Sequence, residues 1–357
     1  MRIGVVIPAY NAAAWVGDAI ASVLAQTHRE WQLVVVDDGS TDATTEVVVR
    51  LADGRIRLIR QRHAGVSAAR NCATMRLADQ PWARRGRDDS EAVLFLDADD
   101  WLAPEALERL AAALDAAPHA VAASGAFTYV GTGTIRKPPS GELLEPLLVR
   151  NLFANGGHLL LRAEAVRRAG GFRPELSYGE DWEFWIRVAL QGPFASTEDD
   201  KPVLFVRQRG DGAYQRLAAD PASFVPCMEA IFSNPALLVR FGAERLREIR
   251  SRTEAENNWI IGRELIRHGR NGRPWLRRSV LAHPSSKRLA LLAASHVLPL
   301  LPLGWRGPFL PYRLKADAQP HAPRPAGGWC KGCASLAGSP AMPRGNTGQR
   351  SQRSSRS

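Results

Sequence analysis

Apolar and polar positions alternate in a regular way through the first 125 residues of this 357-residue chain. Short apolar runs, of the length typical of strands, are separated by longer stretches with apolar residues at helical spacing. This alternation predicts an α/β fold with a mostly parallel central sheet. The expected strands are Ile3–Ile7, Leu33–Val36, Ile56–Ile59, Val93–Leu96 and Ala120–Phe127, and the expected helices lie near Trp15–Ala25, Ala43–Leu51, Val66–Leu77 and Pro104–Ala116.

The pattern changes after this region. Residues 128–150 are rich in Gly, Pro and Thr, and we expect them to link to a second part with a strand at His158–Arg162 and a helix at Glu180–Leu190. From about 225 to 288 the pattern is helical and rich in arginine. Beyond 316 the chain is mostly Pro, Gly, Ser and Arg, which cannot bury a core. We therefore expect an α/β domain over residues 1–215, a basic helical region over 216–315 and a disordered tail over 316–357.

The apolar run Leu289–Leu303 is too short to span a bilayer, and Pro299 and Pro302 interrupt it. It either packs on the helical region, which we favour, or lies in a membrane interface. The chain opens directly on a strand-like run without a signal peptide, and its four cysteines show no secreted pattern. The pair Cys330 and Cys333 has no second ligand pair near it, so zinc is not expected. We therefore expect a cytoplasmic protein.

The charge is distributed unevenly along the chain. Residues 1–239 carry 25 Lys and Arg against 30 Asp and Glu, a balance of −5, whereas residues 240–357 carry 22 against 6, a balance of +16. This separation predicts that the carboxy-terminal part faces something anionic, such as a phospholipid surface, a lipid pyrophosphate or nucleic acid. The alternative is a solvated helical face followed by a basic tail.

Three polar clusters follow expected strands, at Pro8–Asn11, Asp37–Asp42 and Asp97–Asp100. Ligands bind at the carboxyl ends of strands in sheets of this kind, so the clusters are expected to share one edge. Asp97, Asp99 and Asp100 come directly after an apolar strand. Such oxygen ligands suit Mg²⁺ or Mn²⁺, which keep coordination positions for water and phosphate. The alternative is an acidic loop that caps the helix starting near Pro104.

The first two clusters suit a nucleobase. No G-x-G-x-x-G follows the first strand, so a dinucleotide fold is not indicated. An aromatic face at Tyr10 can stack on a base, while the Asp37–Asp38 pair can accept a ring N–H. Farther on, in HAGVSAARNCA (63–73), Gly65 permits a tight turn, Ser67 can cap the next helix, and Arg70 and Asn71 lie in its first turns. A helix start with an arginine is typical of an anion site, although a solvated charge is the alternative.

Taken together and in order, these motifs resemble the family 2 glycosyltransferases, an inverting group with the GT-A fold. The resemblance covers about residues 1–210. The motifs that carry it are IPAYN (7–11), VVDDGSTD (35–42), GVSAARN (65–71), LFLDADD (94–100), GGF (170–172) and GEDWEFWIRVA (179–189).

The resemblance implies roles for individual residues. Pro8, Ala9, Tyr10 and Asn11 would frame the base pocket, Asp38 would accept a bond from the base, and Arg70 would approach the donor. Asp97 would hold the ribose or the water shell of a Mn²⁺ or Mg²⁺ ion that Asp99 binds. Asp181 would be the base for the acceptor hydroxyl, with Glu180 as the competing candidate. Arg207 and Arg209, in RQRGDGAY (207–214), resemble a loop that closes on the pyrophosphate.

The resemblance also implies partners: a nucleotide-sugar donor, with a uridine nucleotide preferred, and a glycan or lipid-linked acceptor. The basic region would add a peripheral contact with an anionic membrane at the inner membrane face, and no nucleic acid is expected. Two alternatives stay open. A nucleotidyltransferase would use the same kinds of groups, but it usually carries a Gly-rich basic loop after the first strand. A non-enzymatic nucleic-acid- or membrane-binding protein would explain the basic half but not the acidic clusters.

Overall fold

The computed structural model describes residues 1–51, 53–78, 91–208 and 220–296. They belong to one compact unit, 1–322, and a second unit, 323–357, lies outside the described residues. Residues 79–90, Arg209, the cysteine pair and the whole predicted tail also lie outside the described residues.

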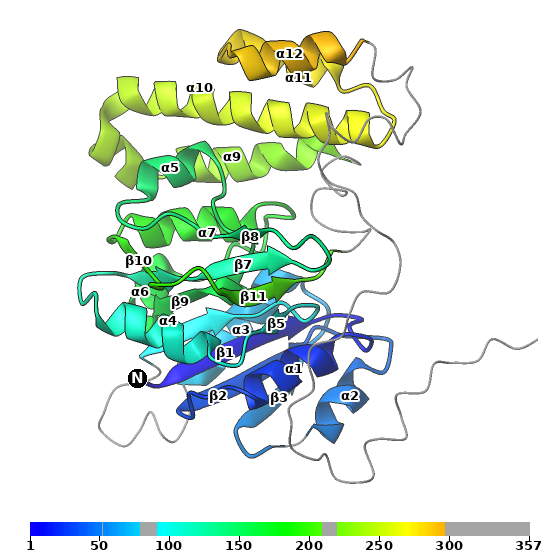
Figure 1. Ribbon diagram of the computed structural model, residues 1–357, viewed down its shortest axis with the longest axis vertical. Coiled ribbons are helices and arrows are strands. Elements are labelled where there is room, and N and C mark those ends of the chain that lie inside the picture. Colours follow the sequence, from blue (N-terminus) through cyan, green and yellow to red (C-terminus); the bar gives the residue numbers. More distant parts are fainter. Residues whose placement is uncertain (52, 79–90, 209–219, 297–357) are drawn as a thin grey trace, which may run out of the picture. The chain divides into compact units, whose positions relative to one another are not determined.

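A seven-stranded, mostly parallel sheet forms the centre of the described part, as predicted (Figure 1). Its strands β1, β2, β3 and β4 run parallel, and only β9 runs antiparallel to its neighbours. The register pairs Ala9 with Asp37, so the ends of β1 and β2 lie side by side. The order is β10 (Phe194–Ser196), β6 (Ala122–Ser124), β9 (Leu159–Arg162), β4 (Ala92–Phe95), β1 (Ile3–Ala9), β2 (Trp31–Asp37), β3 (Ile56–Arg60).

Alternate residues of β1 and β2 enter two hydrophobic clusters, one on each face of the sheet. Val6 and Val34 belong to one cluster, whereas Val5 and Leu33 belong to the other. Such strands are buried on both faces, which is why they read as continuous apolar runs. The helices that follow the first strands confirm the predictions: α1 (Val16–Leu24), α2 (Thr44–Arg50), α3 (Val66–Ala78) and α4 (Ala106–Asp115).

The predicted single strand Ala120–Phe127 is wrong. It is two strands, β6 and β7 (Ala126–Tyr129), which belong to different sheets. Gly125 lies between them, where a Cβ would be 2.6 Å from the Val203 side chain, so only glycine allows this crossing. The second sheet has the order β5 (Trp101–Leu102), β11 (Pro202–Val206), β7, β8 (Ile135–Arg136).

The expected strand at His158–Arg162 is β9, and it joins the central sheet between β4 and β6. Leu159, Leu160 and Leu161 are fully buried there. The predicted link at 128–150 contains β8 and a helix, α5 (Leu144–Val149). The remaining elements are the 3₁₀ turn η1 (Gly156–His158), α6 (Ala163–Ala169) and α7 (Glu180–Ala189), the last of which was predicted.

The helices after residue 220 pack on this framework. They are η2 (Pro221–Ser223), α9 (Phe224–Phe232), α10 (Pro235–Arg267), α11 (Arg273–Ala282) and α12 (Ser286–Ala294). Cys227, Ile231 and Ile249 share one hydrophobic cluster with Trp182 and Phe184 of α7, and α10 lies along α5 (Figure 1). In the described part of the run at 289–303, Leu291 packs against Trp259 and Leu276, which agrees with the favoured packing.

Within the described residues, no single helix has the length and apolar composition to cross a bilayer. The segments Pro221–Phe232 and Pro235–Arg267 meet that test only as a pair, bent by 94°.

Candidate active site

Three carboxylates lie together where β4 ends. Oxygens of Asp97, Asp99 and Asp100 are within 4.8 Å of one another, and this set of hard donors fits a divalent ion such as Mg²⁺ or Mn²⁺. Helix α4 begins after Glu105 and has no side-chain cap, so the alternative of a capping loop has no support.

Asp100 is held differently from the other two. Its Oδ1 accepts the Arg207 backbone N–H at 2.7 Å, and its Oδ2 accepts the Asn155 amide at 2.6 Å. Burial, with Asp99 and Asp97 nearby, raises the pKa of Asp100 well above its usual range. Asp100 therefore anchors the loop, and Asp97 and Asp99 are the more accessible oxygen donors.

Arg70 joins this cluster to helix α7. Its guanidinium donates to Asp97 Oδ1 at 2.9 Å and to Glu180 Oε1 at 3.1 Å, and it lies 5.0 Å from the Phe172 ring. Burial disfavours its charge, but Asp97 and Glu180 outweigh burial and raise the pKa of Arg70. Asn71 fixes the Phe172 backbone with bonds of 2.7 and 2.8 Å. The D-A-D and G-E-D motifs, far apart in the sequence, are thus held together.

Asp181 differs from its neighbour Glu180. Burial and then the charge of Glu180 raise the pKa of Asp181 to about 7, although Arg70 opposes this shift. Its Oδ2 is 3.4 Å from the Asn151 amide, whereas Glu180 is tied into the ion pair with Arg70. Asp181 is thus the carboxylate of this pair that can exchange a proton near neutral pH.

The residues predicted to frame a base pocket lie where β1 and β2 end. Pro8 and Ala9 are buried, and the Ala9 carbonyl accepts the Asp38 N–H at 2.8 Å. Asn11 adopts a left-handed conformation (φ 48°), and its Oδ1 accepts the Thr41 N–H at 2.8 Å. Tyr10 is 47% exposed. Its ring stacks on the His63 ring, with centroids 4.1 Å apart and planes at 25°.

The buried Asp38 carboxylate accepts bonds from the loop before α3. Oδ1 accepts the Ala64 N–H at 2.9 Å and the Gln61 amide at 2.6 Å, and Oδ2 accepts the Gly65 N–H at 2.8 Å. The prediction that Ser67 caps α3 is wrong. Ser67 lies inside the helix and its buried hydroxyl has no hydrogen-bond partner, since Asp38 binds the loop N–H groups that precede the helix.

Arg207 lies beneath the carboxylate loop. It is 8% exposed, and its guanidinium donates to the Asp99 carbonyl at 2.7 Å and to Asp18 Oδ2 at 2.9 Å, 4.8 Å from the Trp101 ring. Its contact with a donor stays a prediction, as do the donor and catalytic roles of the other candidates. Arg209 lies outside the described residues.

Several residues at the site were not found from the sequence. Asn155 and Asn151 lie in a loop without periodicity. Phe172 belongs to the recognised GGF motif, but nothing in the sequence shows its contact with Arg70. His63 stands within a motif that was recognised, but nothing in the sequence shows its stacking on Tyr10. His158 is structural: burial lowers its pKa to about 3, and its ring is 3.1 Å from both the Gly125 carbonyl and the Ala154 N–H.

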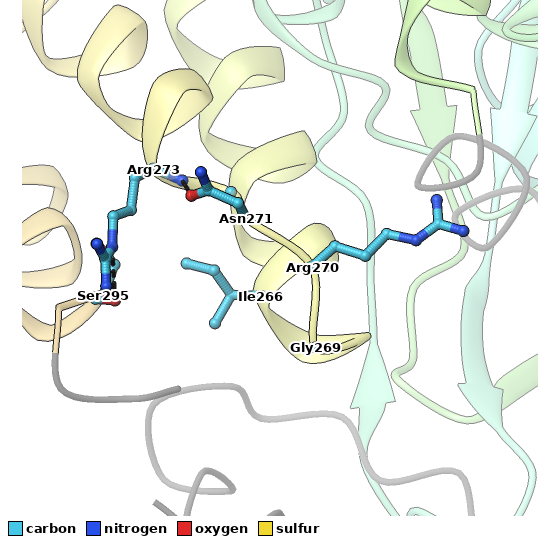
Figure 2. A pocket seen from close by; sticks show the side chains of 7 residues that line it. Ile266, Gly269, Arg270, Asn271, Arg273 and Ser295 are labelled. Carbon is cyan, nitrogen blue, oxygen red and sulfur yellow. Dashed lines mark hydrogen bonds between the residues drawn. The ribbon is translucent and has the colours of Figure 1, made fainter. Parts of the chain in front are cut away.

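One further pocket lies between the ends of α10 and α12 and the start of α11 (Figure 2). Its Arg273 donates to the Ser295 carbonyl at 3.1 Å, and the Arg270 side chain extends away from Ser295. None of the carboxylates described above lines this pocket. Its lining is Ile266, Gly269, Arg270, Asn271, Gly272, Arg273 and Ser295.

Comparison with known proteins shows what this chain and its fold are similar to. Residues 4–169 match the family model of Glycosyl transferase family 2. TarS 1–349 from S. aureus superposes with a TM-score of 0.56 at 18% identity, over 84% of this chain and 88% of that one. The mannosyltransferase PcManGT from Pyrobaculum calidifontis, in complex with GDP-Man and Mn²⁺, gives 0.53 at 20% identity over 84% and 81%. These likenesses show a GT-A fold.

Over residues 4–169, a little under half of its length, the chain is similar to glycosyltransferase family 2. It is 40% identical over 113 residues to the uncharacterized glycosyltransferase alr2836 of Nostoc, which covers 31% of this chain and 32% of that protein. It is 38% identical over 103 residues to the E. coli UDP-Glc:alpha-D-GlcNAc-diphosphoundecaprenol beta-1,3-glucosyltransferase WfgD, covering 28% and 36%. The chain thus spans about a third of the length of these two relatives.

Proposed function

We propose that this protein transfers a sugar from a nucleotide-sugar donor, most favourably a uridine diphosphate sugar, to an acceptor hydroxyl with inversion, in the synthesis of a bacterial surface polysaccharide or glycolipid. The observation that carries this proposal is the link Asp97–Arg70–Glu180, because it holds a metal-type carboxylate cluster beside a carboxylate with a pKa of about 7. The carboxylate cluster that would assist the leaving group thus lies beside Asp181, which would remove the proton.

The donor end is supported by the corner of β1 and β2. Tyr10 is a half-exposed aromatic side chain on which a base can stack, and Asp38 is an acceptor suited to the imide N–H of uracil or thymine. The relative WfgD is named for a UDP-glucose donor, and TarS 1–349 has been solved with UDP. The lipid-linked acceptor in the name of WfgD supports an acceptor of that kind here.

Asp97 and Asp99 would hold a Mn²⁺ or Mg²⁺ ion, with Asp100 fixing their loop. Such an ion supplies charge neutralisation to a departing diphosphate. The protein's own part of the chemistry falls to Asp181. As the acceptor oxygen attacks the anomeric carbon, its proton passes to the Asp181 carboxylate, and the bond from that carbon to the phosphate oxygen breaks with its electron pair. A single displacement of this kind inverts the anomeric configuration.

The test begins with donor binding. Thermal-shift measurements with UDP-, GDP-, dTDP- and CMP-sugars and Mn²⁺ identify the nucleotide, because a ligand that binds only the folded state raises the melting temperature. We expect the uridine and thymidine donors to give the largest shifts and Asp99→Asn to lose the metal-dependent part. A larger shift with the guanosine donor would contradict the assignment of the base, and full turnover in EDTA would contradict the metal.

Turnover then tests the catalytic assignment. Asp181→Asn keeps the size of the side chain but cannot take a proton, so turnover should fall by roughly two to four orders of magnitude while donor affinity changes little. Glu180→Gln serves as the neighbouring control and should retain more activity. NMR of the anomeric proton should show a β-linked product from an α-linked donor, and retention of configuration would refute the mechanism.

We further propose that the donor chemistry resides in residues 1–215 and that the basic region 216–315 holds the protein peripherally at the cytoplasmic face of the inner membrane, close to a lipid-linked acceptor. The support is the charge of 240–288, where 13 basic residues stand against 5 acidic ones. The exposed apolar side chains Leu238 and Val239 lie beside Arg240 at the start of α10.

A further inference from the structure

The base corner of this site is already filled by one of the protein's own side chains. His63 lies over the face of Tyr10, with ring centroids 4.1 Å apart, and its Nδ1 is 2.9 Å from Asp38 Oδ2. The same ring thus covers the aromatic face and contacts the carboxylate that the proposed function gives to the nucleobase.

The stacking leaves no room for a base between the two rings. Stacked aromatic carbons approach to about 3.5 Å, so a third ring between Tyr10 and His63 needs a separation of about 7 Å. The observed 4.1 Å is the spacing of a direct pair. A base that uses this face of Tyr10 must therefore replace the imidazole.

The hydrogen bonds of Asp38 lead to the same result independently. A carboxylate has about four lone-pair sites on its two oxygens. In the structure Oδ1 accepts from Ala64 and Gln61, and Oδ2 accepts from Gly65 and faces His63 Nδ1. Three of these sites have a donor, and the remaining one faces His63 Nδ1, which also lies 3.1 Å from the Asp38 backbone carbonyl. A nucleobase N–H can reach this remaining site only when the His63 ring moves away.

His63 is the neighbour of Asp38 best able to leave. The N–H groups of Ala64 and Gly65 belong to the backbone that enters α3, and Gly39 packs so closely that a Cβ there would be 2.8 Å from the His63 nitrogen. The backbone at His63 is thereby fixed, but its side chain is 55% exposed and free to rotate into solvent. Gln61 can also leave, but its departure would not uncover Tyr10.

We propose that His63 is a built-in competitor for the nucleobase: its side chain occupies the Tyr10 face and one acceptor site of Asp38 until the donor displaces it. This inference rests on the proposed function and adds a determinant of donor affinity at the same site. Only the fraction of molecules in which His63 has moved away can then bind the base. The measured dissociation constant therefore equals the intrinsic constant divided by that fraction.

The experiment is calorimetry of UDP binding to the full chain and to His63→Ala, with Gln61→Ala as the matched control. We expect His63→Ala to bind UDP about threefold to tenfold more tightly than the unchanged protein. Gln61→Ala frees an acceptor site but not the Tyr10 face, so its effect should be smaller.

Two results would overturn the inference. Equal or weaker binding by His63→Ala would show that the ring is a neutral neighbour or a platform on which the base stacks. Absence of binding by both proteins, with UDP and with dTDP, would remove the proposed function and this inference with it. The first result leaves the proposed function intact, so the two failures are distinguishable.

Discussion

At the scale of single residues, the site shows how neighbours in the sequence acquire different chemistry. Glu180 and Asp181 are both carboxylates at the start of α7, and the sequence left both open as the base. The structure pairs Glu180 with Arg70 and leaves Asp181 partly buried beside that charge. Burial and a neighbouring negative charge both favour the protonated form, so the pKa of Asp181 rises while Glu180 holds its partner.

A pH profile should report this difference. Asp181 acts only as a carboxylate, so kcat/KM should fall about tenfold per pH unit below a midpoint near its raised pKa of about 7. Glu180→Gln removes the negative charge that helps to raise this pKa, and the midpoint should move to lower pH. The measurement is kcat/KM between pH 5 and 9 for both proteins. An unchanged midpoint in Glu180→Gln would show that another group controls the acid limb.

At the scale of elements, the sequence predicted those strands and helices whose pattern is decided locally. Strands β1 to β4 and helices α1 to α4 were found because continuous apolar runs and helical spacing persist over whole elements. The division of Ala120–Phe127 was missed because it depends on Val203, far away in the sequence, which excludes any side chain at position 125. The place of β9 within the sheet was missed for the same reason: pairing partners are not written in a strand's own residues.

The candidate site was predictable to a similar degree. Residues in the recognised motifs, such as Asp99 and Arg70, were found, and the structure places them in one region. The support from Asn155 was not found, because this residue reaches the site through the folding of a loop that carries no periodic signal. Phe172 lies in the recognised GGF motif, but its contact with Arg70 depends on the tertiary fold. The capping role given to Ser67 failed because Asp38, from another strand, binds the N–H groups of Ala64 and Gly65.

Arg207, which follows β11 directly, connects the carboxylate loop at Asp97–Asp100 to α1. Its guanidinium joins the Asp99 carbonyl to Asp18 in α1, and its backbone N–H binds Asp100. Arg207→Ala should therefore loosen the loop and raise the Mn²⁺ concentration needed for half-maximal turnover by about 10- to 100-fold, the usual loss when a supporting partner of a metal ligand is removed. Arg109→Ala is the control, since its guanidinium binds Asp199 and the Lys201 carbonyl elsewhere.

The Mn²⁺ titration separates support of the loop from direct contact with the donor. If Arg207 only supports the loop, nucleotide affinity without metal should be unchanged in Arg207→Ala. A loss of UDP binding in EDTA would assign it to the pyrophosphate instead, and an unchanged Mn²⁺ requirement would exclude the supporting role.

At the scale of the whole molecule, the separation of charge in the sequence has a partial explanation in the structure. Several arginines of α10 and α12 bind acidic groups of the protein: Arg245 and Arg252 pair with Glu145, Arg250 with Glu229, and Arg288 with Glu256. The pairs with Glu145 and Glu229 join α10 to α5 and α9, and the pair with Glu256 joins α12 to α10. Since the acids in 240–288 are outnumbered by 13 to 5, the region remains positive after pairing.

That residual charge and the exposed apolar residues at the start of α10 predict salt-sensitive attachment to anionic membranes. Val239 is 87% and Leu238 52% exposed, beside Arg240. Each basic group near an anionic surface contributes on the order of 1 kcal/mol of binding free energy, and buried apolar side chains add to this.

In flotation with anionic liposomes, the full chain should bind at low salt and release at high salt. The double variant Val239→Glu with Arg240→Glu should weaken this binding severalfold. Met75→Glu, at a 63% exposed apolar position on α3, is the matched control and should bind normally. Binding that is absent at low salt, or equal in all three proteins, would place the attachment elsewhere and favour an acceptor that reaches the enzyme from solution.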